Sequence, residues 1–501
     1  MVVLQALLLA SLAASTPILH RRADLQSCLS SSGAQPVFPS SSNYESASAA
    51  YNQRVQPSPA AVVRPTSVGQ LRTVLACARD SGAPVSARGG GHSYASYGLG
   101  DVSTSAVVVD MSAFNTIQVA DDGTALIGGG QRLGDIYLAL DAAGKGFPAG
   151  TCPFVGIGGH AGYGGYGFAA RWQGLAVDRV VAYNVMLANG TFIQNLSPQR
   201  DPDLFWALNG AASSFGIVTA FQVKTFDAPS QAVMFSYSYD GADVSTLTKA
   251  FLAFQSWGAS AAPSSLGIAA IISPGGKLEF SGVQYGVSRQ EFDNVISSLT
   301  RMLPEGYSYD IHETDWIGSL KELANGQSLD TTGQTSNRDT FFAKSLMVPG
   351  KSPISKQAAT AFFNYLSSTS TDTNWFVMCD LYGGAGSKVN AVSLNSSSFG
   401  RRDSQTVCQF YASSPTYGLP WPSDGTSFVK GMYNALVDPM KTTWGNGMGA
   451  YTNYIDPTLS QSDSRNLYWG SQYTRLSQIK SRVDPAELFR FQQSIRPAGK
   501  S

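Results

Sequence analysis

Two residues with reactive side chains stand beside runs of glycine. His92 follows three consecutive glycines, and Cys152 lies near the start of a glycine-rich segment that runs from Gly150 to Gly167. Glycine lets backbone N–H groups approach a ligand closely, and a pyrophosphate is the ligand that most often uses such a loop. For the first motif alone, an ordinary structural loop with a hydrogen-bonded histidine is the alternative.

Cysteine counting singles out the same segment. Of the five cysteines, Cys28 and Cys77 lie near the N-terminus, where they would form one disulfide. Cys379 and Cys408 sit in two strand-like runs and either pair or stay as buried thiols. An odd cysteine in a secreted chain asks for an explanation, and Cys152 has little to pack against among glycines.

The glycine run also contains a nominal dinucleotide fingerprint, which we discount. That fingerprint needs a strand before it and a helix after it in a parallel unit. Here the following segment, residues 180–192, reads as a β-hairpin with an Asn189-Gly190 turn. A metal enzyme is not indicated either, because the four histidines show no paired ligand spacing.

The predicted secondary structure that positions these residues differs before and after about residue 228. A helix capped at Ser67 and stopped at Gly82 precedes a short strand that leads to His92. Further segments up to about residue 228 are expected as strands 107–109 and 125–130 and helices 133–140 and 203–208. Beyond that point, alternating strands such as 234–239 and 375–380 are interspersed with amphipathic helices, which predicts an antiparallel sheet backed by helices. A last helix passes through residues 476–483.

Composition sets the class of ligand and the compartment. The 501 residues include 34 basic and 34 acidic side chains, so nothing favours binding to nucleic acid or to an anionic membrane, and a neutral ligand fits better. The apolar N-terminus predicts a signal peptide, with a membrane anchor as the alternative, although a span needs about 20 apolar residues. Acceptor patterns for glycans at Asn189 and Asn395 agree with secretion, and Asn195 ranks below them because Pro198 follows its pattern.

Four motifs in order resemble the berberine-bridge-enzyme-like flavoproteins of the vanillyl-alcohol-oxidase superfold, and within them the fungal oligosaccharide oxidases. They are the stretch 88–94, the stretch 150–167, the stretch 203–218, and an ending with Asn453 to Asp456, Tyr468 to Gly470, Lys480, Asp484-Pro485 and Phe489. The resemblance implies an α+β fold in which a two-part FAD-binding domain of the PCMH type carries an inserted substrate domain. The expected segments are a signal peptide with a possible short pro-segment at 1–22, FAD-binding parts at 23–228 and 451–501, and a substrate domain at 229–450.

The resemblance implies FAD as the cofactor, with His92 bonded to the flavin 8α-methyl group and Cys152 to C6. Two tethers would raise the redox potential of the flavin and fix its ring beside an open groove. The other residues expected at the cofactor are Arg88, Gly89, Gly90, Gly91, Ser93, Val155, Gly156, Gly158, Gly159, His160, Gly162, Gly216, Ile217 and Asn453.

For the reaction, the resemblance implies oxidation of the anomeric hydroxyl of a reducing-end sugar to a lactone, with dioxygen reduced to hydrogen peroxide. Tyr454 would be the catalytic base and Asp380 its supporting carboxylate. An ionised neighbour raises the pKa of a tyrosine, so a proton relay fits better than a resting phenolate. Val155 stands where oxidases of the family tend to carry valine, which indicates access for oxygen.

Aromatic and polar side chains are expected to line a groove that binds a neutral oligosaccharide. They are Tyr94, Trp375, Phe376, Gln409 and Tyr451. The protein itself is expected to be a monomer. The sequence departs from the gluco-oligosaccharide oxidases at Met378, where those have glutamine, and at Ile271, where they have glutamate, so xylo- or chito-oligosaccharides are expected. The alternatives are oxidation of a phenolic, alkaloid or polyketide metabolite, and a binding protein without turnover.

Overall fold

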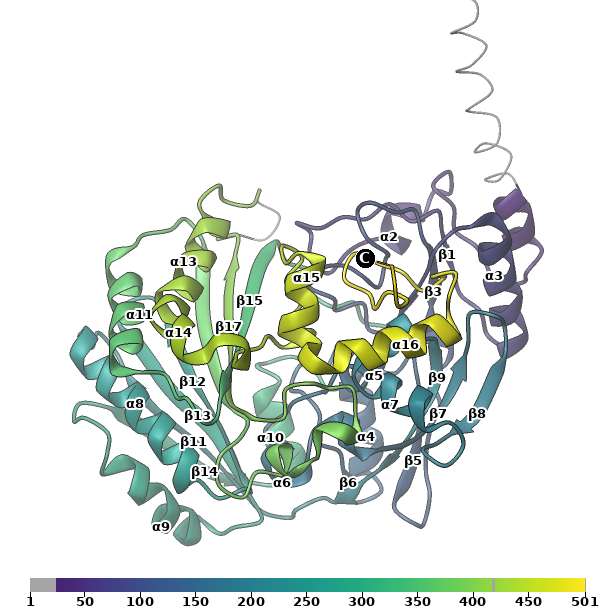
Figure 1. Ribbon diagram of the computed structural model, residues 1–501. Coiled ribbons are helices and arrows are strands. Elements are labelled where there is room, and N and C mark those ends of the chain that lie inside the picture. The colour runs from purple at the N-terminus through teal and green to yellow at the C-terminus, as the bar shows by residue number, and fades with distance from the viewer. Residues whose placement is uncertain (1–23, 417–419, 501) are drawn as a thin grey trace, which may run out of the picture.

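The computed structural model describes residues 24–416 and 420–500, and it contains two halves that lie side by side (Figure 1). One half holds a small parallel sheet and a five-stranded antiparallel sheet, whereas the other is built on a seven-stranded antiparallel sheet. The last long helix, α16 (Tyr473–Val483), returns to the first half. The predicted α+β class is confirmed. The predicted signal peptide lies outside the described residues.

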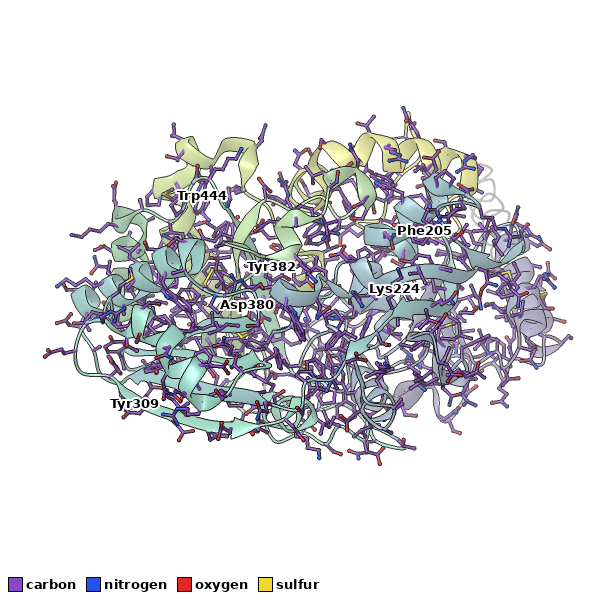
Figure 2. All side chains as sticks on the ribbon, turned by 90° about the horizontal axis from the view of Figure 1, so that it is seen from below. Phe205, Lys224, Tyr309, Asp380, Tyr382 and Trp444 are labelled. Atoms are coloured by element: carbon purple, nitrogen blue, oxygen red, sulfur yellow. A yellow bond between two sulfur atoms is a disulfide. The ribbon has the colours of Figure 1, made fainter. Side chains whose placement is uncertain are left out.

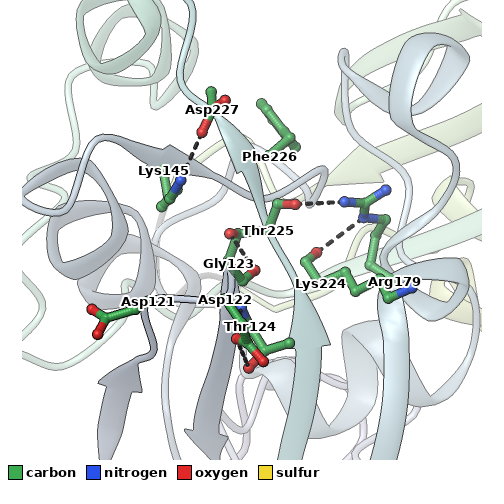
Figure 3. Close-up of a pocket in the computed structure, with 10 residues that line it drawn as sticks. All are labelled: Asp121, Asp122, Gly123, Thr124, Lys145, Arg179, Lys224, Thr225, Phe226 and Asp227. Carbon is green, nitrogen blue, oxygen red and sulfur yellow. Dashed lines mark hydrogen bonds and ion pairs between the residues drawn. The ribbon is translucent and has the colours of Figure 1, made fainter.

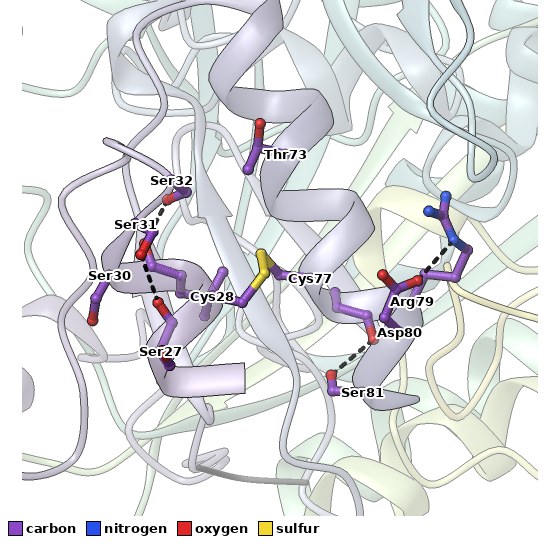
Figure 4. The surroundings of a disulfide bond; sticks show 12 residues. Ser27, Cys28, Ser30, Ser31, Ser32, Thr73, Cys77, Arg79, Asp80 and Ser81 are labelled. Atoms are coloured by element: carbon purple, nitrogen blue, oxygen red, sulfur yellow. Dashed lines mark hydrogen bonds and ion pairs between the residues drawn. A yellow bond between two sulfur atoms is a disulfide. The ribbon is translucent and has the colours of Figure 1, made fainter. Parts of the chain in front are cut away.

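The parallel sheet leads the chain to His92. Its order is β1-β3-β2, with β1 at Ala61–Val63, β3 at Val107–Asp110 and β2 at Val85–Arg88. Helix α3 (Val68–Ser81) begins where the Ser67 side chain accepts from the Gln70 N–H, and it ends at Gly82 in the left-handed conformation, as expected. A disulfide joins Cys77 of this helix to Cys28 of the helix at 24–30 (Figure 4).

The five-stranded sheet carries the second glycine segment and its neighbours. Its order is β4-β5-β9-β7-β8, with bounds Ile117–Val119, Thr124–Gly128, Ile217–Lys224, Val180–Met186 and Phe192–Leu196. The expected hairpin is β7 and β8. The helices of this half include α2 (Tyr44–Ala47), α4 (Leu133–Asp141), α5 (Ile157–Gly162), α6 (Ala170–Gln173), α7 (Pro202–Ala211) and α15 (Gln461–Ser464), and β6 (Lys145–Gly146) pairs with β10 (Phe226–Asp227). The sequence did not predict α5, because glycine disfavours helix.

The seven-stranded sheet is the antiparallel sheet that the alternation predicted. Its order is β14-β11-β13-β12-β16-β17-β15. The bounds, in that order, are Ser308–Thr314, Ala232–Tyr239, Lys277–Tyr285, Leu266–Ser273, Asn374–Leu381, Ser404–Ser413 and Phe341–Pro349. The helices that follow or cover these strands are α8 (Val244–Ser260), α9 (Arg289–Thr300), α10 (Trp316–Leu323), α11 (Lys356–Ser368), α12 (Lys388–Ala391), α13 (Gly425–Val437) and α14 (Lys441–Trp444).

The strand period of two separates a core face from a site face on this sheet. Cys379 points into the core beneath α8, α9, α11 and α13, where it forms a disulfide with Cys408 directly across the strand pair. Asp380, the next residue, points to the opposite face, toward the other half. Both pairs of cysteines that the sequence matched are therefore disulfides, and Cys152 is left free.

No helix within 24–416 or 420–500 combines the length and the apolar composition needed to cross a bilayer.

Candidate functional site

The loop after β2 presents His92 in a defined orientation. The ring of Tyr51 stacks on the imidazole with 3.9 Å between centroids. His92 Nε2 lies 2.8 Å from the Ser336 hydroxyl, so Nδ1 is the ring nitrogen that is left available. Burial, helped by the nearby Arg132 cation, lowers the pKa of His92 to about 4, so the imidazole is neutral at physiological pH.

The second glycine segment lies against the first, which brings Cys152 toward His92. A Cβ on Gly90 would lie 2.3 Å from the Gly156 nitrogen, and a Cβ on Gly156 would lie 2.1 Å from the Gly90 nitrogen. Any side chain at either position would push the two loops apart. Glycine is therefore required at both positions by a close approach of two backbones.

Cys152 is a free thiol that solvent reaches, although protein atoms surround its sulfur closely enough for desolvation to raise its pKa. Its charge would act on Tyr51, Tyr94 and Tyr454, which places all three near the sulfur. A free cysteine, a neutral histidine and backbone without side chains fit a flavin held by two bonds. Gly159 in α5 has no atom within 4 Å of its Cβ position, which leaves open space there.

His160 holds the loop that carries Cys152 by a hydrogen bond to its backbone. Its Nε2 accepts a hydrogen bond of 2.9 Å from the Gly150 N–H, and burial lowers its pKa to about 4, which keeps the ring neutral and able to accept. The Asn453 amide donates to the His160 carbonyl at 3.1 Å. These two predicted cofactor residues thus hold the loop that carries Cys152, and direct contact with FAD stays a prediction.

Tyr454 and Asp380 come from opposite halves of the molecule. Tyr454 ends the turn Thr452–Tyr454, and its ring stacks on Tyr94 with 5.9 Å between centroids. Asp380 in β16 is 2% exposed, and its Oδ2 has no hydrogen-bond partner within the described chain. Figure 2 shows Asp380 and Tyr382 near the middle of the molecule. An uncompensated buried carboxyl oxygen of this kind is expected at a working proton acceptor.

The pKa values of the pair are both raised, for related reasons. Burial raises the pKa of Asp380 to about 7. Burial also raises the pKa of Tyr454 well above 10, and the Asp380 charge adds to that shift by repulsion. At neutral pH, Tyr454 is therefore a phenol, while Asp380 is poised to hold or release a proton.

One row of side chains crosses the site face beside Asp380. Ile271 pairs with Met378 across β12 and β16, and Met378 pairs with Gln409 across β16 and β17. The Gln409 amide donates to the Tyr94 hydroxyl at 2.9 Å. The two positions at which the resemblance predicts a departure from gluco-oligosaccharide oxidases are thus direct neighbours, and they form an apolar wall beside a polar group.

Phe376 lies one row further out on the same face. Its ring stacks on Tyr411 at 4.9 Å, and Tyr411 stacks on Phe341 at the same separation. The Tyr411 hydroxyl donates to Asp339 at 2.8 Å. Phe376 and Tyr94 therefore belong to one aromatic surface. Trp375 points to the other face and packs against the core.

Two predicted residues have contacts that serve the framework. Tyr451, predicted to bind substrate, is 2% exposed, and its hydroxyl accepts from the N–H groups of Gly165 and Tyr166. Such a residue positions the second glycine segment. Arg88, predicted at the cofactor, forms an ion pair of 2.6 Å with Asp110 and donates to the Ala47 carbonyl.

The remaining predicted cofactor residues lie on the two glycine segments or at the start of β9. Ser93 accepts from the Tyr97 N–H, and Val155 follows the Cys152 turn. Gly216 packs so closely that a Cβ would lie 2.7 Å from Val185, and Ile217 is buried. The structure thus gives these residues framework contacts, and their contacts with FAD stay predictions.

Sequence reasoning missed Tyr51, Ser336, Asp339 and Tyr411. None of them lies in a glycine run or beside another reactive residue in the sequence. Tyr51 stacks on His92, whereas Ser336 and Asp339 belong to the segment between α10 and β15. Tyr411 lies in β17 and reaches Asp339 through its hydroxyl. Only tertiary contacts reveal them.

An open surface pocket lies away from these residues (Figure 3). Its lining residues are Asp121, Asp122, Gly123, Thr124, Lys145, Arg179, Lys224, Thr225, Phe226 and Asp227. Lys145 pairs with Asp227, and Arg179 donates to two backbone carbonyls, so these charged groups already have partners. We therefore place the candidate site at His92 and Cys152. No cluster of three metal-ligating side chains occurs in the part of the chain that the structure describes.

Comparison with known proteins agrees with this site. The FAD binding domain model matches residues 59–195, and the berberine and berberine-like model matches residues 450–496. The chain is 31% identical to the xylooligosaccharide oxidase of Thermothelomyces thermophilus, with 97% of each chain covered. It is also 31% identical to the chitooligosaccharide oxidase of Gibberella zeae, with 95% of each covered.

A solved structure of glucooligosaccharide oxidase from Acremonium strictum, described with a 6-S-cysteinyl, 8α-N1-histidyl FAD, has a TM-score of 0.88. It is 29% identical, and the match covers 95% of this chain and 100% of that one. Its flavin is bonded to the two residue types that this chain brings together at Cys152 and His92. The chain therefore belongs to the berberine-bridge-enzyme-like family of FAD-dependent oxidoreductases, and FAD is its cofactor.

Proposed function

We propose that this enzyme oxidises the anomeric hydroxyl of the reducing-end sugar of a neutral oligosaccharide to a lactone, with dioxygen reduced to hydrogen peroxide. The observation that carries the proposal is the buried Asp380 carboxyl, which has an unpartnered oxygen and whose charge acts on Tyr454 close to the free Cys152. FAD, tethered at His92 and Cys152, would accept the hydride from the sugar carbon. The relatives named above act on oligosaccharides, which supports the substrate class.

The proton of the substrate hydroxyl must leave as the hydride leaves. Tyr454 is protonated at neutral pH, so it accepts this proton only if it passes its own proton onward. Asp380, with a pKa of about 7, would be the acceptor, because its buried Oδ2 has no hydrogen-bond partner in the described chain and its charge acts on Tyr454. A relay from substrate to Tyr454 to Asp380 keeps only one of the two groups charged at any time, which avoids the repulsion between them.

The row of Ile271, Met378 and Gln409 on the site face of the sheet favours a sugar that makes few polar contacts on one side. Ile271 and Met378 supply an apolar wall, while Gln409 and the Tyr94 hydroxyl supply hydrogen bonds. Phe376 and Tyr94 offer rings for stacking on a sugar face. A xylo-oligosaccharide, which lacks a hydroxymethyl group, or a chito-oligosaccharide, which carries an acetamide, matches this surface better than a gluco-oligosaccharide.

Several features extend the proposal to the whole chain. The signal peptide and short pro-segment expected at 1–22 would make the enzyme extracellular, and both disulfides suit an oxidising compartment. We infer a monomer in which residues 23–228 and 451–501 bind FAD and residues 229–450 bind the sugar. Val155 beside the Cys152 turn supports access for dioxygen.

A peroxide-coupled assay across cello-, xylo-, chito- and malto-oligosaccharides tests the proposal. Turnover of one series with one peroxide released per lactone is expected, and Tyr454→Phe should lower kcat at least about hundredfold with the flavin still bound. Turnover of a phenolic, alkaloid or polyketide substrate in place of every sugar would refute the substrate class. A flavin that light reduces but no sugar reduces would leave only a binding protein.

A further inference from the structure

The two hydrogen bonds of Ser336 favour a proton on one particular ring nitrogen of His92. Ser336 Oγ lies 2.8 Å from His92 Nε2, and the same hydroxyl donates to the Asn337 carbonyl at 3.1 Å. The Asn337 carbonyl can only accept, so when the single serine proton is donated to it, the serine oxygen accepts from His92. This arrangement puts the imidazole proton on Nε2 and leaves an unshared electron pair on Nδ1.

The surroundings keep that electron pair available. Burial and the Arg132 cation lower the pKa of His92, so Nδ1 is not protonated at neutral pH. Tyr51 stacks on the ring and fixes its plane. The stacking contact and the hydrogen bond at Nε2 together restrict the rotation of the ring about its side-chain bonds.

The segment that carries Ser336 is anchored on the FAD-binding half. Arg132, at the start of α4, donates to the Gln334 carbonyl at 2.9 Å. Asp135 in α4 accepts from both the N–H and the hydroxyl of Thr331, at 2.9 Å and 2.5 Å. The segment lies between α10 and β15 in the sequence, yet its contacts hold it beside His92.

We propose that Ser336 is the positioning residue for covalent attachment of FAD at His92, because its hydroxyl holds the imidazole in the tautomer that presents Nδ1 to the flavin. The inference rests on the family assignment and on His92 as a tether, and it does not depend on the sugar. In the attachment, a bond forms between Nδ1 and the flavin 8α carbon. One C–H bond of the methyl group and the Nε2–H bond break, and the two electrons reduce the flavin, which dioxygen then reoxidises to give hydrogen peroxide.

Ser336 also suits the end of this step. After Nδ1 is alkylated, Nε2 gives up its proton and becomes an acceptor. A hydroxyl can rotate to donate where it previously accepted, so Ser336 remains bonded to the ring in both states. An apolar side chain of the same size offers neither bond.

The experiment compares variants at position 336 in a Cys152→Ala background, where only the histidine bond is available. Ser336→Thr and Ser336→Val have nearly the same shape and differ by one hydroxyl, and Thr335→Ala is the neighbouring exposed control. Each full-length protein is purified, its total FAD is measured, and the fraction that stays with acid-precipitated protein is determined. Mass spectrometry of the peptide with His92 confirms the bond.

We expect Ser336→Val to lower the covalent fraction at least about tenfold while non-covalent FAD remains, and Ser336→Thr and Thr335→Ala to match the parent. An equal covalent fraction in Ser336→Val and Ser336→Thr would overturn the proposal. An equal loss in both variants would overturn it as well, since shape and not the hydroxyl would then be responsible. Failure to oxidise sugars would not bear on it, because no sugar enters the measurement.

Discussion

At the scale of single residues, the site depends on the burial of ionisable side chains that are usually hydrated. Asp380 is buried with an unpartnered oxygen, so its pKa rises to about 7. His92 and His160 are buried without a carboxylate partner, so the pKa of each falls to about 4. The same physical cause thus places one carboxyl in the range of a neutral-pH base and keeps two imidazoles uncharged.

Asp380→Asn should lower the activity of the enzyme and raise its stability. A carboxyl whose pKa is higher in the folded than in the unfolded chain binds its proton more tightly when folded. Its contribution to stability is therefore present at low pH and is lost as the pH rises to about 7. The free energy of unfolding of Asp380→Asn minus that of the wild type should grow between pH 4 and pH 7 and level off above, toward a total on the order of 4 kcal/mol, and the Tm difference should grow in parallel.

The activity of the same variant supplies the second half of this test. We expect kcat/KM of the wild type to fall below pH about 7 as Asp380 is protonated, and Asp380→Asn to lose at least about hundredfold at pH 8. The exposed Asp372→Asn is the control for both measurements. A Tm difference that does not vary with pH would contradict the elevated pKa.

Met378→Gln should change the preference among sugars. The residue lies between Ile271 and Gln409 on the site face, so an added amide would offer a hydrogen bond to a hydroxyl group. One such bond is worth about 1 kcal/mol, so kcat/KM for cello-oligosaccharides should rise several-fold relative to xylo-oligosaccharides. Met302→Gln makes the same replacement at an exposed position and should leave the ratio unchanged.

At the scale of elements, one buried cation joins the two halves. Arg171 in α6 is fully buried, and it donates to the carbonyls of Ala262, Pro263, Leu266, Gly383 and Ala385. These carbonyls lie before and at the start of β12 and just after β16, which carries Asp380. Burial lowers the pKa of Arg171 to about 10, which still leaves it charged at neutral pH. The side chain therefore ties the end of the Asp380 strand to the FAD-binding half.

Arg171→Met should destabilise the protein by about 3 kcal/mol or more, because several buried carbonyls would lose their donors. Chemical denaturation of the holoenzyme measures this change. Arg301→Met at an exposed position should stay within about 0.5 kcal/mol of the wild type. Equal stability of the two variants would show that water replaces the guanidinium without loss.

At the scale of the whole molecule, the balance of charge agrees with a neutral substrate. The 34 basic and 34 acidic residues cancel, and Arg402 and Lys480 form buried ion pairs with Asp178 and Asp484. Such a molecule has no net charge that would steer a charged ligand from a distance. Shape and short-range contacts on the site face must therefore select the substrate.

The kcat/KM for a neutral oligosaccharide should change less than about twofold between low and high salt, because screening acts on charges that the substrate lacks. Steady-state rates in about 0.02 M and 0.5 M sodium chloride measure this dependence. A steep fall with salt would point to a charged substrate.

The sequence by itself determined the local pattern and the reactive residues. Period-two alternation predicted the antiparallel sheet, the Ser67 cap and Gly82 bounded α3, and cysteine counting isolated Cys152. These features depend on residues close together in the sequence or on composition, so the amino-acid sequence alone is enough to predict them. The α5 helix escaped prediction because its glycines disfavour helix, and its stability comes from the packing around it.

Only the tertiary structure decided how these residues work together. The sequence placed Tyr451 among the groove residues, but the fold buries it against Gly165 and Tyr166. Tyr51 and Ser336 meet at His92 although 285 positions separate them in the chain. Burial, hydrogen-bond direction and pKa are properties of the space around a group, and that space is made by segments distant in sequence. This is why the sequence named His92 and Asp380, while the folded chain supplied the hydroxyl beside the first and the burial that raises the pKa of the second.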